Sequence, residues 1–541
     1  MPIFDDTTWS GRVSLGGSSW ADGPDVGLDA SVGLGAWSLR ALASARDSGN
    51  YEDGAGAEVR SAASSRSAAL LAGWRPDERT TVDLSYEHTA TDDALFAGAG
   101  MDAPEDRGDF FRLSSRRWAA DGGLGWQIDA FASTVDHFMD NFSLRPLTAP
   151  MAMLVPTETS TQGLRGHVEL GRTSPVLLGI TAEQANADAT RFAGPNAASA
   201  TTVQSIMWPD VDRLQVGAFA EAATVLGPAT RLVWGARIDH FSADAERADE
   251  RTMGGSGPAP RQLWLRYSGN ADDSWSTTDL GGLVRLEHNA GAWQLFAGLS
   301  RSIRAADATE RFLAANSSMT AKRWIGNPGL DNARHHQLDL GLSWRQAGRH
   351  LDATLFFDEV DDFLLRDRAH GQEGILQNDS ATVYRNVDAR RSGFEVDGMM
   401  QLGQRLVLSG AVAWVRADNT TDDRPLAQTP PLNGSLVAAW SPENWSLAGT
   451  LRWAARQDRV DADPSTGSGL DAGPTPGWAV LDLLGEIVIG RGFGLAAGVA
   501  NVFDRTYASH LNRASLFDPE PVRVNEPGRT VWVRLSWRGQ G

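Results

Sequence analysis

The sequence predicts an all-β fold: a large antiparallel transmembrane β-barrel of about 22 strands, with short periplasmic turns and long extracellular loops. Three observations predict this fold. Apolar residues recur at every second position, short turns alternate with long polar segments, and aromatic residues gather near the ends of the expected strands. A membrane demands that every backbone polar group be paired, and a closed barrel meets that demand with strands alone.

The alternation of apolar and polar residues is visible along most of the chain. In TVDLSYEH, the apolar side chains of Val82, Leu84 and Tyr86 stand two apart, so a strand places them on one face. In QLDLGLSWRQAGRHLDATLFF, Leu338 and Leu340 continue the same pattern up to a short turn, and Leu351 resumes it. Equivalent hairpins are expected at LGGLVRLEHNAGAWQLFAGLS, FEVDGMMQLGQRLVLSGAVAW and LNGSLVAAWSPENWSLAGTLRW.

The connections between these strands alternate in length. LGPATR, RQAGRH and HNAG are tight turns, whereas long polar segments are expected as loops at 183–212, 243–275, 304–334 and 416–429. Tryptophans lie near the strand ends, at Trp74, Trp234, Trp293, Trp344, Trp440, Trp445 and Trp453. Strands of about ten alternating residues, asymmetric connections and aromatic girdles together indicate a membrane barrel.

A soluble all-β protein is the alternative, in the form of a sandwich, a propeller or a β-solenoid. A propeller is disfavoured because no fixed repeat of about 40–50 residues is visible. A sandwich of 541 residues would be unusual. The membrane barrel therefore remains the preferred interpretation.

The composition narrows the classes of function. No stretch approaches the ~20 apolar residues of a membrane-spanning helix. The chain has no cysteine, which excludes thiolate metal sites and thiol nucleophiles. Its formal charge of −19 argues against nucleic acid as a partner. His88, His240 and His370 lie near acidic residues but without catalytic spacing, so no enzyme is expected.

Several motifs resemble those of TonB-dependent outer-membrane receptors. The C-terminal stretch GVANVFDRTYASHLNRASLFDPEPVRVNEPGRTVWVRLSW resembles the terminal signature of that family, with matches at Asn501, Phe503, Asp504, Tyr507, His510, Glu526, Pro527, Gly528 and Arg529. GNPGLDNARHHQLDLGLSW, YRNVDARRSGFEVDG and PLAQTPP resemble further family segments. The resemblance implies a barrel domain over residues 1–541 in the outer membrane of a Gram-negative cell, surrounded by lipid and acting as a monomer.

Three segments resemble the copper-receptor branch of that family: FAGAGMDAPED, VDHFMDNFSLRP and RSIRAADATERFLAA. In that branch an H-x-M pair on the barrel contributes to a copper site, and His137 and Met139 match it. The chemistry agrees, because thioether sulfur suits Cu(I) and imidazole binds copper in either oxidation state. Copper is therefore the expected transported ion.

Other side chains are weaker candidates for copper ligands. Met101 lies in an expected loop, and Met151 and Met153 stand two apart, as if on one strand face. His335 and His336 are adjacent, so at most one of them can enter the lumen, and both are interpreted as structural.

The resemblance also implies parts that the sequence as given does not display. DDTTWSGRVSLGG is expected as the first barrel strand, and no export signal or N-terminal plug domain is expected within residues 1–541. The family's coupling to the TonB–ExbB–ExbD complex, and two further copper ligands, would come from that plug. Receptors for an iron–siderophore chelate or cobalamin, and a passive porin-like channel, remain alternative functions.

Overall fold

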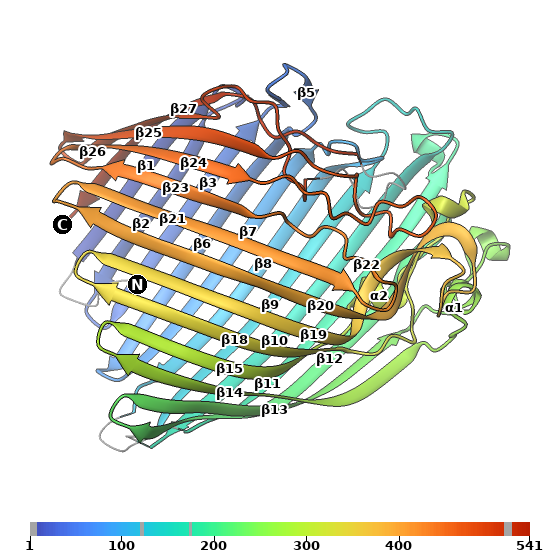
Figure 1. The fold of residues 1–541 in the computed structure, drawn as a ribbon. Helices are drawn as coiled ribbons and strands as arrows, with labels where there is room; N and C mark the ends of the chain where they lie inside the picture. Colours follow the sequence, from blue (N-terminus) through green and yellow to red (C-terminus); the bar gives the residue numbers. More distant parts are fainter. Residues whose placement is uncertain (1–7, 120–123, 172–175, 513–521) are drawn as a thin grey trace.

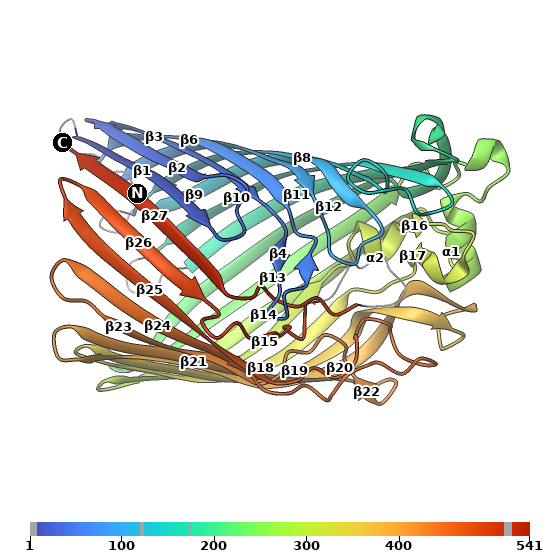
Figure 2. The same ribbon diagram turned by 90° about the horizontal axis from the view of Figure 1, so that it is seen from above.

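The computed structural model describes residues 8–119, 124–171, 176–512 and 522–541. They form a closed antiparallel barrel of 22 strands, which confirms the predicted fold and strand number (Figures 1 and 2). Each strand pairs with the next barrel strand along the chain, and β1 (Thr8–Ser18) pairs with β27 (Thr530–Gln540) to close the cylinder. The expected first strand is β1, and its first residues, 5–7, lie outside the described residues.

The remaining barrel strands are β2 (Asp25–Leu34), β3 (Trp37–Ser48), β6 (Ala63–Asp77), β7 (Thr80–Ala94), β8 (Asp102–Arg117), β9 (Gly125–Asp140), β10 (Ala152–Leu170), β11 (Val176–Gly194), β12 (Thr202–Gly227), β13 (Thr230–Ala245), β14 (Ser274–Ala290), β15 (Trp293–Arg304), β18 (Ala333–Gln346), β19 (Arg349–His370), β20 (Asn378–Leu402), β21 (Leu406–Asn419), β23 (Asn433–Trp440), β24 (Trp445–Ala454), β25 (Trp478–Gly490) and β26 (Phe493–Ala500).

The two ends of the barrel differ, as the sequence predicts. Hairpins such as β12–β13 and β18–β19 turn within a few residues at one end, here called the short-turn end. Ser10 pairs with Gln540, so the beginning of β1 and the end of β27 meet at that same end. The opposite, long-loop end carries the connections at 49–62, 246–273, 305–332 and 455–477, and the described residues 501–512 and 522–529.

One predicted loop is wrong. Residues 183–212 do not form a long loop, because β11 continues to Gly194 and β12 begins at Thr202. On β11 the outward face, which carries Leu178 and Ile180, continues with the polar Gln184, Asn186 and Asp188. The large apolar side chains that mark a lipid-facing strand are therefore missing from this strand end, while the backbone pairing continues, with register shifts around Ala189.

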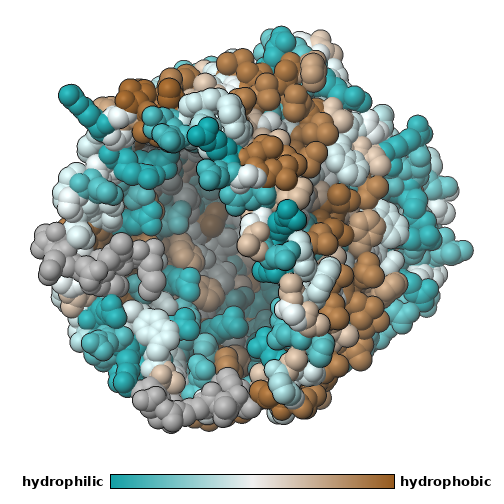
Figure 3. Space-filling model, turned by 60° about the vertical axis from the view of Figure 1, so that its left-hand side comes forward, coloured by the Kyte–Doolittle hydropathy of each residue, from teal (hydrophilic) through white to brown (hydrophobic). Residues whose placement is uncertain are grey.

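The outer wall of the barrel is apolar. Outward side chains at mid-strand are exposed in the isolated chain, for example Leu340 at 39% and Leu299 at 64%. Figure 3 shows hydrophobic residues on the outer surface and hydrophilic residues around the central hollow. A continuous apolar belt of this kind belongs against lipid rather than water. No helix among the described residues is long and apolar enough to cross a membrane.

Tryptophans gather toward the short-turn end of the belt. Trp37 stacks on Trp74 with ring centroids 5.4 Å apart, and Trp440 meets Trp445 edge to face at 4.8 Å. Trp293 and Trp344 form a third pair at 6.0 Å. Indole rings with an apolar body and one donor suit the boundary between lipid and water.

Small elements fill the long-loop end. They are β4 (Tyr51–Glu52), β5 (Glu58–Val59), η1 (Ala197–Ser199), η2 (Met253–Gly255), α1 (Pro260–Ser268), α2 (Ala308–Phe312), β16 (Ala314–Ala315), η3 (Thr320–Lys322), β17 (Trp324–Ile325) and β22 (Arg424–Pro425). Figure 1 shows α1 and α2 at the end opposite the tight hairpins.

The connection 305–332 packs inside the mouth rather than projecting from it. Ser205 of β12 donates a hydrogen bond of 2.6 Å to the carbonyl of Ala314, and Trp324 pairs with Thr382 of β20. Asp307 caps α2 by accepting from the backbone N–H of Glu310. This connection therefore joins two distant parts of the barrel wall.

An apolar cluster, here called the mouth cluster, forms where this connection meets the strands. Its buried members are Val155, Ala189, Met207, Ala306, Leu313, Ala315, Trp324, Leu330, Ala333, Val360, Leu364, Leu365, Tyr384, Val387, Ala389, Ala417 and Leu426. A barrel of this width cannot fill its interior with strand side chains alone, so the loop supplies the packing.

Candidate functional site at the barrel mouth

His137 and Met139 lie on the lumen face of β9. On that strand Ile128 points outward with 47% of its surface exposed, and Asp129 on the other face accepts a hydrogen bond from Arg112. His137 and Met139 share the odd-numbered face of Asp129. Both side chains are half-buried and lie near the end of β9 that leads into the mouth.

The neighbouring strands surround this pair with same-face partners. His137 stands opposite Thr157, and Met139 stands opposite Val155, both on β10. Val155 is a member of the mouth cluster, so Met139 lies directly beside that cluster. Paired side chains on one face of an antiparallel ladder have Cβ atoms roughly 4.5–5.5 Å apart.

The imidazole of His137 is held by a carboxylate. Its Nδ1 lies 2.8 Å from Oδ2 of Asp106, which stands opposite His137 on β8. With Nδ1 donating to Asp106, Nε2 keeps its lone pair and is the nitrogen free to bind a metal. Metal-binding histidines are commonly oriented in this way by a second group behind the ring.

The structure places the weaker candidates differently: Met101 packs against the mouth cluster, and Met151 does not share a strand with Met153. Met101 precedes β8 and packs against the mouth cluster. Met153 is on β10, two residues before Val155 and on the same face. The prediction that Met151 shares that strand face is wrong, because β10 begins at Ala152 and Met151 lies in the preceding bend, 44% exposed.

The two adjacent histidines separate as predicted. His335 forms an ion pair of 3.0 Å with the buried Asp358, which also binds Arg391. The His336 side chain points to the other face of β18, and its Nε2 lies 3.4 Å from Oδ2 of Asp361. Both histidines have carboxylate partners, which agrees with a structural role.

The three segments that resemble copper receptors meet at the mouth. Asp102, in the first segment, is fully buried and forms a two-point ion pair with Arg145, in the second, with N–O distances of 2.8 and 2.5 Å. Arg60 donates a further hydrogen bond of 2.6 Å to Asp102. The third segment supplies Leu313 to the same mouth cluster that holds Val155.

Asp106 and Asp102 are residues of the candidate site that sequence reasoning missed. Both belong to FAGAGMDAPED, so the segment itself was recognised. The signal that would have found Asp106 is the β8–β9 register, in which it faces His137.

Comparison with known proteins agrees with this architecture. The family described as TonB dependent receptor-like, beta-barrel matches residues 8–502. The chain therefore belongs to the TonB-dependent receptor family, whose members reside in the outer membrane of Gram-negative bacteria and are transporters and receptors rather than enzymes.

Individual relatives cover the chain to different extents. The copper transporter OprC is 26% identical, with a TM-score of 0.84, over 99% of this chain and 81% of its own. The metal-pseudopaline receptor CntO of Pseudomonas aeruginosa is 29% identical over 126 residues, which are 22% of this chain and 17% of that protein. The ferric yersiniabactin receptor FyuA of Yersinia pestis shares the fold, with a TM-score of 0.74 at 12% identity over 99% of this chain and 80% of its own.

Proposed function

We propose that this chain forms the barrel of a TonB-coupled importer of copper. The observation that carries the proposal is that His137 and Met139 share the lumen face of β9, with Asp106 orienting the imidazole, at the mouth where three distant segments meet. The similarity to the copper transporter OprC supports the same cargo. The donors are an imidazole nitrogen and a thioether sulfur, which form a set suited to copper and poorly suited to hard cations.

Two side chains are not a complete coordination sphere. We propose Met101 as a third donor from the barrel, because it packs against the mouth cluster, which contains Val155, the residue opposite Met139. In the resemblance to copper receptors, the remaining ligands and the contact with TonB belong to a plug domain. Copper would then stay bound at the mouth until TonB moves that plug and opens a path down the lumen.

A receptor for a metal chelate is the second candidate, supported by the similarity of a 126-residue segment to the metal-pseudopaline receptor CntO. The two candidates differ in what they recognise. A bare ion needs soft donors at bonding distance, whereas a chelate brings its own donors and is recognised by its surface.

Copper binding to the purified barrel separates these functions. His137→Ala with Met139→Ala should lower Cu(I) affinity at least tenfold, measured by competition with a chromophoric Cu(I) chelator. Met400→Ala is the matched control. Met400 lies on β20, and its side chain points outward from the barrel rather than into the lumen, with 37% of its surface exposed. Copper affinity that survives the double substitution would refute the copper site and favour the chelate receptor.

A further inference from the structure

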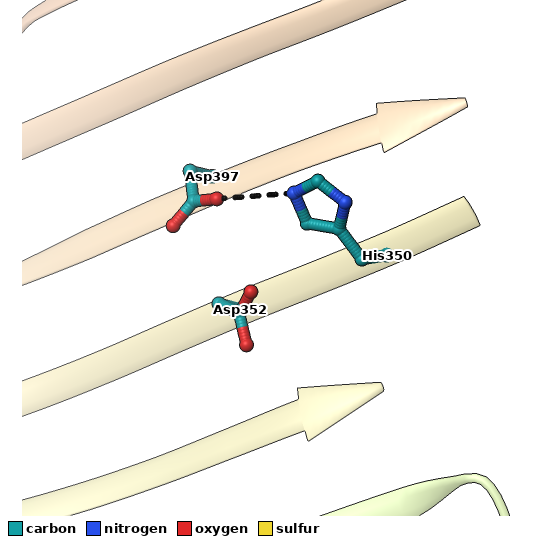
Figure 4. Close-up of side chains that lie close together, drawn as sticks. All are labelled: His350, Asp352 and Asp397. Atoms are coloured by element: carbon teal, nitrogen blue, oxygen red, sulfur yellow. Dashed lines mark ion pairs between the residues drawn. The ribbon is translucent and has the colours of Figure 1, made fainter. Parts of the chain in front are cut away.

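A second group of donors lies at the other end of the lumen. His350 and Asp352 of β19 and Asp397 of β20 each offer an atom, and these atoms all lie within 4.8 Å of one another (Figure 4). Within the described ranges, no other three histidine or acidic side chains come this close. The group was not predicted from the sequence, because Asp397 is 45 positions from Asp352 along the chain and stands opposite it only in the folded sheet.

The β19–β20 register explains why these side chains meet. Asp352 stands opposite Asp397, and His350 stands opposite Met399 on the same face. Leu351 and Leu355, on the alternate positions of β19, point outward with 36% and 48% exposure. The side chains of His350, Asp352, Asp397 and Met399 therefore face the lumen, close to the tight turn between β18 and β19.

The charges of the group are only partly compensated. His350 Nε2 lies 3.5 Å from Asp397 Oδ2, which is longer than an ordinary hydrogen bond. Asp352 is paired with Arg345 at 3.0 Å, at the half-exposed lumen surface. Among the described residues, Arg345 is the arginine that forms an ion pair with this group, and the Asp397 side chain is 56% exposed to the lumen.

We propose that His350, Asp352 and Asp397 form a metal site on the lumen wall at the short-turn end, with the thioether of Met399 as an additional donor. Imidazole and carboxylate together suit Cu(II), and the Irving–Williams order places copper above zinc at such a set. Donors around one ion stand about 3–3.5 Å apart, so small rotations of these exposed side chains bring them into range. Bound metal takes the place of Arg345 on Asp352.

The role of this site rests on the proposed function. An ion released from the mouth travels toward the short-turn end, and this site would hold it where it leaves the lumen. The binding itself does not depend on the mouth site, because the two groups of donors share no residue and lie at opposite ends of the barrel. The two proposals can therefore fail separately.

Titration of the full chain in detergent with Cu(II) tests the site. Bound copper is counted after gel filtration, and the nitrogen coupling of the copper is read by electron paramagnetic resonance. His350→Gln with Asp397→Asn should remove about one copper ion per chain and its nitrogen signal. His137→Ala with Met139→Ala should leave that signal in place.

His336→Gln with Asp361→Asn is the matched control, since that outward pair is also a histidine and an aspartate 3.4 Å apart but lacks a third donor. The control should retain the copper, and Zn(II) should displace copper from the wild-type chain only in large excess. Folding of each variant is checked by its heat-dependent mobility on a gel. An unchanged copper count in the folded His350/Asp397 variant, or an equal loss in the control, would overturn the proposal.

Discussion

The hydrogen bond between Asp106 and His137 gives a quantitative prediction for the mouth site. Asp106→Asn keeps the size of the side chain but replaces a charged acceptor 2.8 Å from Nδ1 with a neutral amide. The imidazole then loses the charged acceptor that holds its orientation. Removal of such a group behind a metal-binding histidine costs ten- to a hundredfold in affinity.

The position of the pair decides where in that range the effect falls. The side chains of His137 and Asp106 are 28% and 39% exposed, so water screens part of the interaction. We therefore expect the lower end, a tenfold loss of Cu(I) affinity, which corresponds to about 1.4 kcal/mol. The measurement is competition for Cu(I) against a chromophoric chelator under reducing conditions.

Asp136→Asn is the control for this substitution. Asp136 lies next to His137 in the sequence, but its side chain points to the opposite face of β9. The Asp136→Asn substitution removes one negative charge from the same region but leaves the contacts of the His137 imidazole unchanged. Equal losses of affinity in the two variants would show that net charge alone is responsible, and no loss in Asp106→Asn would refute the orienting role.

Three further predictions concern the barrel and its loops. Leu340→Arg on the apolar belt should destabilise the folded barrel in a bilayer by about 2–4 kcal/mol, measured by urea titration against a Leu340→Met control that should change little. Asp367→Asn removes one of the two carboxylates that bind the buried Arg385, the one 2.9 Å away, and leaves Asp422 as its partner. A hydrogen bond to a charged group contributes about 1.5–3 kcal/mol. Arg424 binds both Asp367 and Asp461 of the 455–477 connection, so hydrogen exchange in that connection should accelerate at least about tenfold, and unchanged protection would contradict this. Burial lowers the pKa of His510 below 6.5, against the attraction of Asp471. The folded loops therefore favour neutral His510, so their stability is complete above pH 6.5 and falls as the pH drops below it. Proteolysis of the 501–512 segment should increase from pH 7.5 to pH 5, and His510→Gln should remove that part of the dependence.

Much of the fold could be predicted because its signals are local. Side chains of a strand alternate every two residues, so the lipid-facing positions such as Leu340 are visible in a short stretch of sequence. Tight turns and long connections are also read locally, which gave the asymmetry between the two ends. The error at 183–212 has the same origin, since large apolar side chains are missing from the outward face of β11 beyond Ile180, although its pairing with β12 continues.

The candidate site was predicted only in part. The sequence alone indicated that His137 and Met139 share a face, because they are two residues apart in a strand. It did not indicate which residues face them. Asp106 is 31 positions away from His137, and Leu313 of the mouth cluster is more than 170 positions away.

The sequence by itself thus determined the class of fold, the lipid-facing wall and the one pair of soft donors, because each depends on spacings of a few residues. The tertiary structure decided that Asp106 stands behind His137, that the connection 305–332 packs into the mouth cluster, and that His350 and Asp397 meet at the short-turn end. These contacts depend on strand register and on a loop folded into the lumen. Register follows from the pairing of whole strands and the closure of the barrel, which no short stretch of sequence encodes.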